Sequence, residues 1–208
     1  LIVSCSDEPG EGEHKLYKYI RDYPDEHNKF TTVIYGLDAD LIMLTLNHLD
    51  IAKSMYLYRE TPHFIKSLDK SLNPNCSYLM DIPKFATALA YDLNDNKKPE
   101  TKQKLNRIFD YILLCFFMGN DFLPHFPALN IRTTGIDRIM DAYKSVIGTT
   151  NENLTNGDTI YWKNLRKVIM KLADNEDELM VEEYQIREKQ ARNTKTRSSK
   201  LDEKFTSI

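Results

Sequence analysis

The sequence has little of what marks exported, zinc-binding or membrane-spanning chains. Its 208 residues include three cysteines and one tryptophan. The cysteines, Cys5, Cys76 and Cys115, show no CxxC spacing, so neither a disulfide framework nor a zinc site is expected. The longest apolar run, residues 111–118, is far shorter than the roughly 20 residues that cross a bilayer. The sequence therefore predicts an intracellular chain and does not decide between cytoplasm and nucleus.

An excess of positive charge is also missing. Lys and Arg total 28 against 31 Asp and Glu, a formal net charge of -3. This balance gives no sign of nucleic-acid binding, although a site for divalent cations would itself have to be acidic. The chain starts with Leu1 and has no basic leader segment, and residues 1–5 look like the second half of a strand. We therefore expect that it begins inside a longer protein.

The first 60 residues alternate between helix and strand patterns. Apolar spacing predicts a helix over residues 13–23 and a polar loop over 24–29. Residues 31–35 (TTVIY) are β-branched and aromatic, which predicts a strand buried on both faces, and residues 54–59 predict another. We expect an α/β domain over residues 1–60 with a mostly parallel sheet.

The rest of the chain is mainly helical in pattern. A polar stretch over residues 62–77 predicts a loop or insertion, after which amphipathic helical spacing recurs as far as the charged segment 174–192. Residues 61–193 are thus predicted to form a helical region. The tail at 194–208, with Lys and Arg among Ser and Thr, is predicted to be disordered.

Acidic residues stand in three places where folding alone gives little reason for them. A glycine-spaced pair lies in PGEGEHK (9–15), a second pair follows the apolar run in YGLDAD (35–40), and one acid follows another apolar run in GND (119–121). The five acids are Glu11, Glu13, Asp38, Asp40 and Asp121. Each has an ordinary alternative, such as a solvated turn for the glutamates or a helix cap for Asp40.

Taken together, the acids favour a metal site. Hard cations such as Mg²⁺ take oxygen ligands, and two of them can activate water against a phosphodiester. Because clustered carboxylates repel one another, several acids in one place need such ions to hold them together. His14 and Lys15, at the start of the predicted helix, could face a phosphate or could be ordinary surface residues.

The same segments carry a resemblance to a known family. PGEGEHK (9–15), YGLDADLIML (35–44) and CFFMGNDFLPHFPAL (115–129) resemble, in order, motifs of the Xrn family of 5′→3′ exoribonucleases. The resemblance covers about residues 1–150 and is vaguer beyond them.

The resemblance implies a magnesium-dependent enzyme that degrades single-stranded RNA bearing a 5′-monophosphate to mononucleotides. It implies a nuclease core like that of PIN and flap nucleases, of which residues 1–60 would be the C-terminal half. It places the five acids on positions that hold two Mg²⁺ ions, with Mn²⁺ as a possible substitute. The first strand of that core, its acids and the basic pocket for the 5′-phosphate would precede Leu1, so we expect the isolated chain to be inactive.

Two other functions fit the same residues. One is a flap-type, structure-specific 5′ nuclease acting on DNA, which the acids alone do not separate from an exoribonuclease. The other is a non-catalytic RNA-binding scaffold that keeps the fold.

Overall fold

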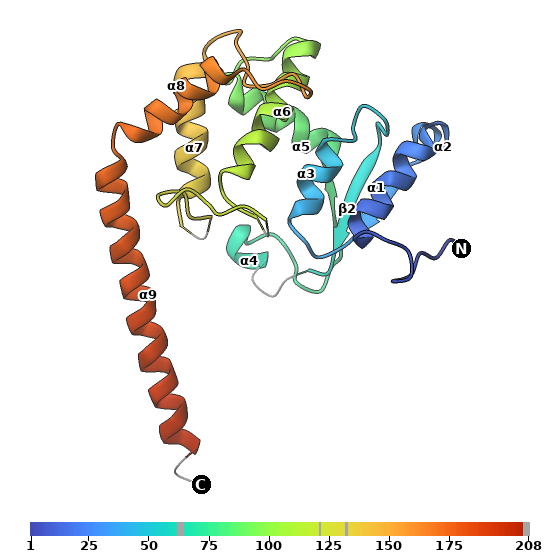
Figure 1. Cartoon of the computed structure of the whole chain (residues 1–208). Helices are drawn as coiled ribbons and strands as arrows, with labels where there is room; N and C mark the ends of the chain where they lie inside the picture. Colours follow the sequence, from blue (N-terminus) through green and yellow to red (C-terminus); the bar gives the residue numbers. More distant parts are fainter. Residues whose placement is uncertain (62–64, 121, 132, 206–208) are drawn as a thin grey trace. The chain divides into compact units, whose positions relative to one another are not determined.

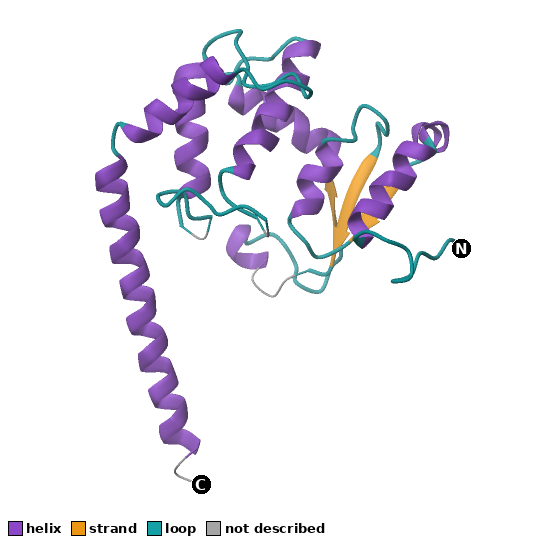
Figure 2. Cartoon of the chain, in the orientation of Figure 1, coloured by secondary structure: helices purple, strands orange, loops and turns teal. Residues whose placement is uncertain are grey.

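The fold is described from a computed structural model, which covers residues 1–61, 65–120, 122–131 and 133–205, without the side chains of Leu68 and of residues 193–205. It is an α/β chain with three strands and a larger helical part (Figures 1 and 2). The strands are β1 (Thr32–Tyr35), β2 (Met55–Arg59) and β3 (Tyr78–Asp81). The helices are α1 (Gly12–Asp22), α2 (Pro24–Lys29), α3 (Asp40–Leu46), α4 (Ile65–Leu68), α5 (Ile82–Leu93), α6 (Thr101–Phe116), α7 (Gly135–Tyr143), α8 (Trp162–Ala173) and α9 (Glu176–Phe205), with a π-helical turn η1 (Lys144–Gly148).

The chain divides into two compact units. The first comprises residues 1–92 and 96–112, and the second comprises residues 93–95 and 113–208. The boundary we expected at residue 60 does not coincide with this division. Helix α5 and most of α6 belong with the sheet because Ile82, Ala86 and Ile108 form one buried cluster with Leu46 of α3.

The sheet has the order β1-β2-β3 and is mixed, whereas we expected it to be mostly parallel. β1 and β2 pair in parallel, which agrees with the predicted parallel arrangement, and their register places Ile34 opposite Leu57. β2 and β3 pair antiparallel with Leu57 opposite Met80. Strand β3 lies just after a polar stretch, and its four residues are too few to show a periodic pattern.

One face of the sheet is covered and the other is open. Tyr17 and Ile20 of α1 and Leu41 of α3 pack with Ile34 and Met55 in one buried cluster, and α1 and α3 flank β2 in Figure 1. The alternate residues of the strands face the other way. Val33, Tyr35 and Leu79 are 51%, 57% and 54% exposed, so the prediction that β1 is buried on both faces was wrong in this chain.

Three segments are helical where we expected none, and one of them is α4, within the loop or insertion predicted over residues 62–77. Residues 24–29 form α2 rather than a loop, with Pro24 at its first position and Asp25 and Glu26 in its first turn. Proline and acids are favoured at these positions because the first turn has unpaired N–H groups and a positive dipole end.

Disorder was predicted for residues 194–208, of which the structure places residues 194–205 in α9, and residues 206–208 lie outside the described residues. The segment contains three Lys and one each of Arg, Glu and Leu, which are good helix formers.

The second unit is built on α7, α8, η1 and the start of α9. Ile139 and Tyr143 of α7 are buried with Leu165 and Val168 of α8. Arg138 bridges α7 to α9: its Nη2 lies 2.9 Å from Glu182 Oε2 and its Nη1 lies 3.4 Å from Glu183 Oε1. Within the described residues no helix is both long enough and apolar enough to cross a membrane.

Candidate metal centre

The glycine-rich loop delivers two acids to the start of α1. Gly10 has a φ of +105°, in the left-handed region that favours glycine, and the chain then turns into the helix. Glu11 is the N-cap residue of α1, and Glu13 lies in its first turn. Carboxylates are stabilised at this position by the positive end of the helix dipole.

A second acid pair lies between β1 and α3. The strand ends at Tyr35 and α3 begins at Asp40, so both Asp38 and Asp40 lie beyond the carboxyl end of β1. A carboxylate oxygen of Asp38 accepts a long hydrogen bond of 3.4 Å from the backbone N–H of Asp40. The N-cap residue of α3 is Ala39 rather than Asp40, so the cap alternative for Asp40 is wrong.

The two pairs come close enough to affect one another electrostatically. The pKa of Glu13 is raised above its usual value first by partial burial, then by the negative charges of Asp38, Asp40 and Glu11, and His14 opposes the shift. Three of the five acids predicted for the site, Asp38, Asp40 and Glu11, thus act on a fourth, Glu13. The fifth, Asp121, lies outside the described residues.

The four carboxylates do not form a finished metal site. Across the described part of the chain, no group of three or more His, Cys, Asp or Glu side chains could hold a metal ion. The donor chemistry nevertheless suits a hard divalent cation, because all four side chains offer oxygen ligands. Their mutual repulsion, seen in the raised pKa of Glu13, is what a bound cation would relieve.

His14 and Lys15, predicted to contact substrate, face different partners. His14 Nε2 lies 3.9 Å from Glu11 Oε2, and both side chains are exposed. Lys15 Nζ donates a 2.9 Å hydrogen bond to the carbonyl oxygen of Cys5. Lys15 therefore ties the segment before the glycine loop to α1, and His14 lies beside the acids.

A buried tyrosine fixes the position of α1 relative to α3. The hydroxyl of Tyr17 donates to the carbonyl oxygen of Leu41 at 3.1 Å and lies 2.5 Å from Thr45 Oγ1. Thr45 Oγ1 also donates to Leu41 O at 2.6 Å. Tyr17 is 1% exposed, and burial raises its pKa to about 12. This contact joins the helix that carries Glu13 to the helix that begins with Asp40, and no local sequence pattern indicates it.

His48 makes a second connection beside Tyr17. Its Nδ1 donates to the carbonyl oxygen of Leu44 at 2.6 Å, which leaves Nε2 to accept from Arg21 Nη1 at 2.8 Å. The rings of His48 and Tyr17 are 4.7 Å apart. Burial, followed by the charge of Arg21, lowers the pKa of His48, while its bond to Leu44 opposes the shift. The histidine is therefore neutral in the fold at neutral pH.

The third motif, in the second unit, forms a tight turn. Gly119 has a φ of +81°, and a Cβ there would lie 2.7 Å from the backbone nitrogen of His125, so only glycine fits. The side-chain oxygen of Asn120 accepts the backbone N–H groups of Phe122 at 2.9 Å and Leu123 at 2.8 Å. Gly119 and Asn120 are thus explained by the turn itself.

Comparison with known families assigns both parts of the chain. Residues 1–61 match the family model described as the XRN 5′-3′ exonuclease N-terminus. Residues 102–207 match the model described as the Xrn1 helical domain. The two matches fall on the acidic motifs of the first unit and on the helical region.

Curated relatives agree with this assignment. The chain is 28% identical to 5′-3′ exoribonuclease 2 of Arabidopsis thaliana over 92% of its length and 30% identical to that of Eremothecium gossypii over 99%. It is 34% identical to 5′-3′ exoribonuclease 1 of Schizosaccharomyces pombe over 86% of its length. The chain spans 22%, 25% and 14% of these three relatives. Both family models match, one over the first acidic motifs and one over the helical region, and the relatives agree with them. The chain therefore belongs to the Xrn family of 5′-3′ exoribonucleases.

Proposed function

We propose that this chain supplies acidic ligands to the divalent-metal site of a 5′→3′ exoribonuclease that degrades RNA with a 5′-monophosphate to mononucleotides. The proposal rests on the placement of the four acids, with Glu11 and Glu13 at the start of α1 and Asp38 and Asp40 beyond the carboxyl end of β1. The pKa of Glu13, raised first by burial and then by the charges of Asp38, Asp40 and Glu11, agrees with this placement. The helix dipole favours an acid in the first turn of a helix, but it does not account for four carboxylates that repel one another across two segments.

The proposed ions are two Mg²⁺, with Mn²⁺ as a substitute, held by Glu11, Glu13, Asp38 and Asp40. Such ions lower the pKa of bound water and neutralise charge on a phosphodiester. The chain's own part is to position the carboxylates. The Tyr17 contact with Leu41 and Thr45 holds the two acid-bearing helices together. Asp121 is proposed as a further ligand from its motif alone.

We also propose that the chain acts only as part of a longer protein. It spans at most a quarter of each of the three relatives, and the described residues present no complete metal site. The isolated chain is expected to bind Mg²⁺ weakly and not to hydrolyse RNA.

The test uses a longer protein that contains this chain and a 5′-monophosphorylated, single-stranded RNA with Mg²⁺. Asp38→Ala and Glu13→Ala should each lower the rate by at least about 10- to 100-fold, the range typical of losing even an outer partner of a metal site. Asp25→Ala, which removes an exposed acid of α2, is the matched control and should keep the rate. Full activity in both site variants would show that these acids are not ligands.

Three comparisons separate the alternatives. Cleavage of a flapped DNA in preference to the RNA would support the flap nuclease, and equal use of 5′-hydroxyl RNA would remove the 5′-monophosphate requirement. Calorimetry with Mn²⁺ tests the scaffold alternative, because a protein without a site should show no saturable binding that depends on Asp38.

A further inference from the structure

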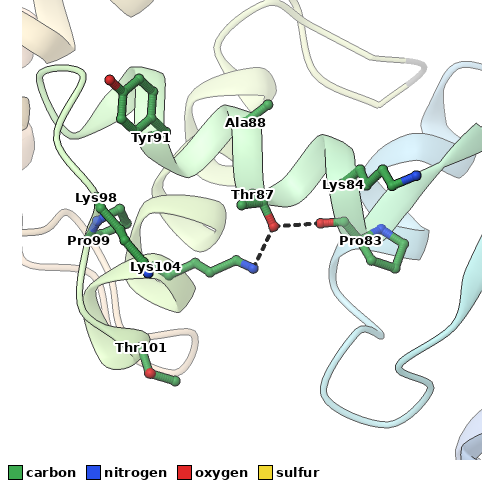
Figure 3. A pocket seen from close by; sticks show the side chains of 9 residues that line it. All are labelled: Pro83, Lys84, Thr87, Ala88, Tyr91, Lys98, Pro99, Thr101 and Lys104. Carbon is green, nitrogen blue, oxygen red and sulfur yellow. Dashed lines mark hydrogen bonds between the residues drawn. The ribbon is translucent and has the colours of Figure 1, made fainter.

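A hollow of about 920 Å³ lies in the first unit, between α5 and the segment that leads into α6 (Figure 3). This volume falls within the range of about 300–1,000 Å³ that is typical of small-molecule sites. Its lining comes from α5 (Pro83, Lys84, Thr87, Ala88 and Tyr91), from the segment before α6 (Lys98 and Pro99) and from the first turn of α6 (Thr101 and Lys104). None of these residues belongs to the proposed metal site.

The hollow combines an apolar surface with lysines. Pro83, Ala88 and Tyr91 line it at helical spacing along α5, and Pro99 lines it from the other segment. Tyr91 is 46% exposed, so its ring is available to a ligand. Apolar and aromatic surface of this kind suits a planar base, since every base can stack on an aromatic side chain.

The lysines give the hollow a positive charge, although the chain as a whole is slightly acidic. Residues 97–104 (KKPETKQK) contain four lysines and one glutamate, in a chain whose formal net charge is -3. Two of these lysines, Lys98 and Lys104, line the hollow. A ligand in contact with them would be anionic.

Lys104 is held in place by a neutral partner. Its Nζ donates to Thr87 Oγ1 at 2.8 Å, and the Thr87 hydroxyl in turn donates to the carbonyl oxygen of Pro83 at 2.8 Å (Figure 3). An ammonium group has three N–H donors, so this bond fixes Lys104 and leaves donors for an anion. Lys84 differs, because its Nζ lies 3.2 Å from the carboxylate of Asp81.

We propose that this hollow binds a nucleotide unit of RNA, with the base against Tyr91 and the prolines and the phosphate against Lys98 and Lys104. This inference rests on the proposed function, since an exoribonuclease presents RNA to the chain's surface. The hollow would be a contact for the strand in addition to the metal site.

The test measures binding of fluorescent decauridylate to the chain by anisotropy in EDTA, which removes divalent ions and prevents hydrolysis. Tyr91→Ala should weaken binding by about 5- to 150-fold, the range for losing one stacked base. Lys98→Gln with Lys104→Gln should reduce the slope of log K against log salt by about 1.4, because each lost phosphate contact on a single strand removes about 0.7. Lys29→Gln with Lys53→Gln, two exposed lysines of the same unit, is the matched control and should leave the slope unchanged.

Two further ligands identify what the hollow recognises. Backbone amide signals of Thr87 and Thr101 should shift on titration with decauridylate, and Tyr91→Ala should abolish these shifts. If uridine monophosphate produces the same shifts with equal affinity, the proposal holds and free nucleotides are the source. If hexaglutamate binds as tightly as decauridylate and Tyr91→Ala weakens the binding of neither, the proposal is overturned, because the lysines would then act as a general anion surface.

The experiments separate a failure of the proposed nucleotide hollow from a failure of the proposed metal site. One combination of results overturns the proposed hollow alone. In it, Asp38→Ala abolishes RNA hydrolysis by the longer protein, the control with Lys29→Gln and Lys53→Gln binds decauridylate normally, and Tyr91→Ala does not change decauridylate binding. Binding that depends on Tyr91, together with hydrolysis that does not depend on Asp38, overturns the metal site alone.

Discussion

Replacing Tyr17 by Phe tests whether its hydroxyl holds α1 against α3. The change removes the contacts of this hydroxyl with Leu41 O and Thr45 Oγ1 and keeps the buried ring. A typical intramolecular hydrogen bond contributes about 0.5–1.5 kcal/mol net, and Thr45 still donates to Leu41 O, so no buried carbonyl is left without a donor. We expect the free energy of unfolding of the first unit to fall by about 1–2 kcal/mol, a 5- to 30-fold change in the folded-to-unfolded ratio.

Urea unfolding followed through amide signals of α1 and α3 measures this change. A double-mutant cycle with Thr45→Val should give a coupling energy of at least about 0.5 kcal/mol if the two hydroxyls act as one contact. Tyr23→Phe, at the exposed end of the same helix, is the matched control.

The same variant connects stability to the metal centre. If α1 moves away from α3, Glu13 should lose part of the repulsion from Asp38 and Asp40, and its pKa should fall toward the ordinary value of 4.5. Carboxyl NMR titration of the two proteins measures this. A Tyr17→Phe protein as stable as Tyr23→Phe, with the pKa of Glu13 unchanged, would refute the reasoning.

Three further perturbations test other contacts. Because the pKa of His48 is lowered in the fold, its contribution to the free energy of unfolding should be fully present above pH 6.5 and should fall as the pH decreases through the folded-state pKa. Urea midpoints at pH 7.5 and 5.5 measure this change. The same difference between the two midpoints in His48→Gln would contradict the role of His48. Asp110→Ala should lower the free energy of unfolding by about 3–5 kcal/mol, because it leaves the fully buried guanidinium of Arg107 without this carboxylate. A thermal midpoint close to that of the unsubstituted chain would show that the Asp110 carboxylate does not stabilise Arg107. Arg138→Ala should speed amide hydrogen exchange over the first four turns of α9, since it removes the guanidinium from the nearly buried Glu183; unchanged exchange would mean that other contacts hold α9.

Periodicity alone predicted the elements that have an apolar stripe. The helices near residues 13–23, 82–93 and 162–172 are present because each buries one face, and the parallel pairing of β1 and β2 follows from the helix between them. A composition of β-branched residues indicated a strand at 32–35 but could not say which faces are covered. Which faces are covered depends on the helices that pack on the strand, and these come from other parts of the chain.

The acids could be singled out from the sequence, but their geometry could not. Glycine spacing and position after a strand pointed to Glu11, Glu13, Asp38 and Asp40. In the structure the pKa of Glu13 is raised first by burial and then by the charges of the other three, and their role as metal ligands stays a prediction. No local signal could show the hydroxyl bonds of Tyr17, whose partners lie 24 and 28 residues along the chain. Tertiary contacts of this kind are decided by how two amphipathic helices meet on the sheet.

The open face of the sheet limits how this chain behaves at high concentration. Val33 and Tyr35 of β1 and Leu79 of β3 expose hydrophobic side chains on this face, and β1 is an edge of the three-stranded sheet. An exposed apolar edge is a template for pairing with another chain, and a single charge on it is a common defence. Gel filtration of the purified chain should therefore show a size that grows with concentration, and Val33→Lys should shift the chain toward the monomer. The material used for every other measurement has to be kept dilute for the same reason.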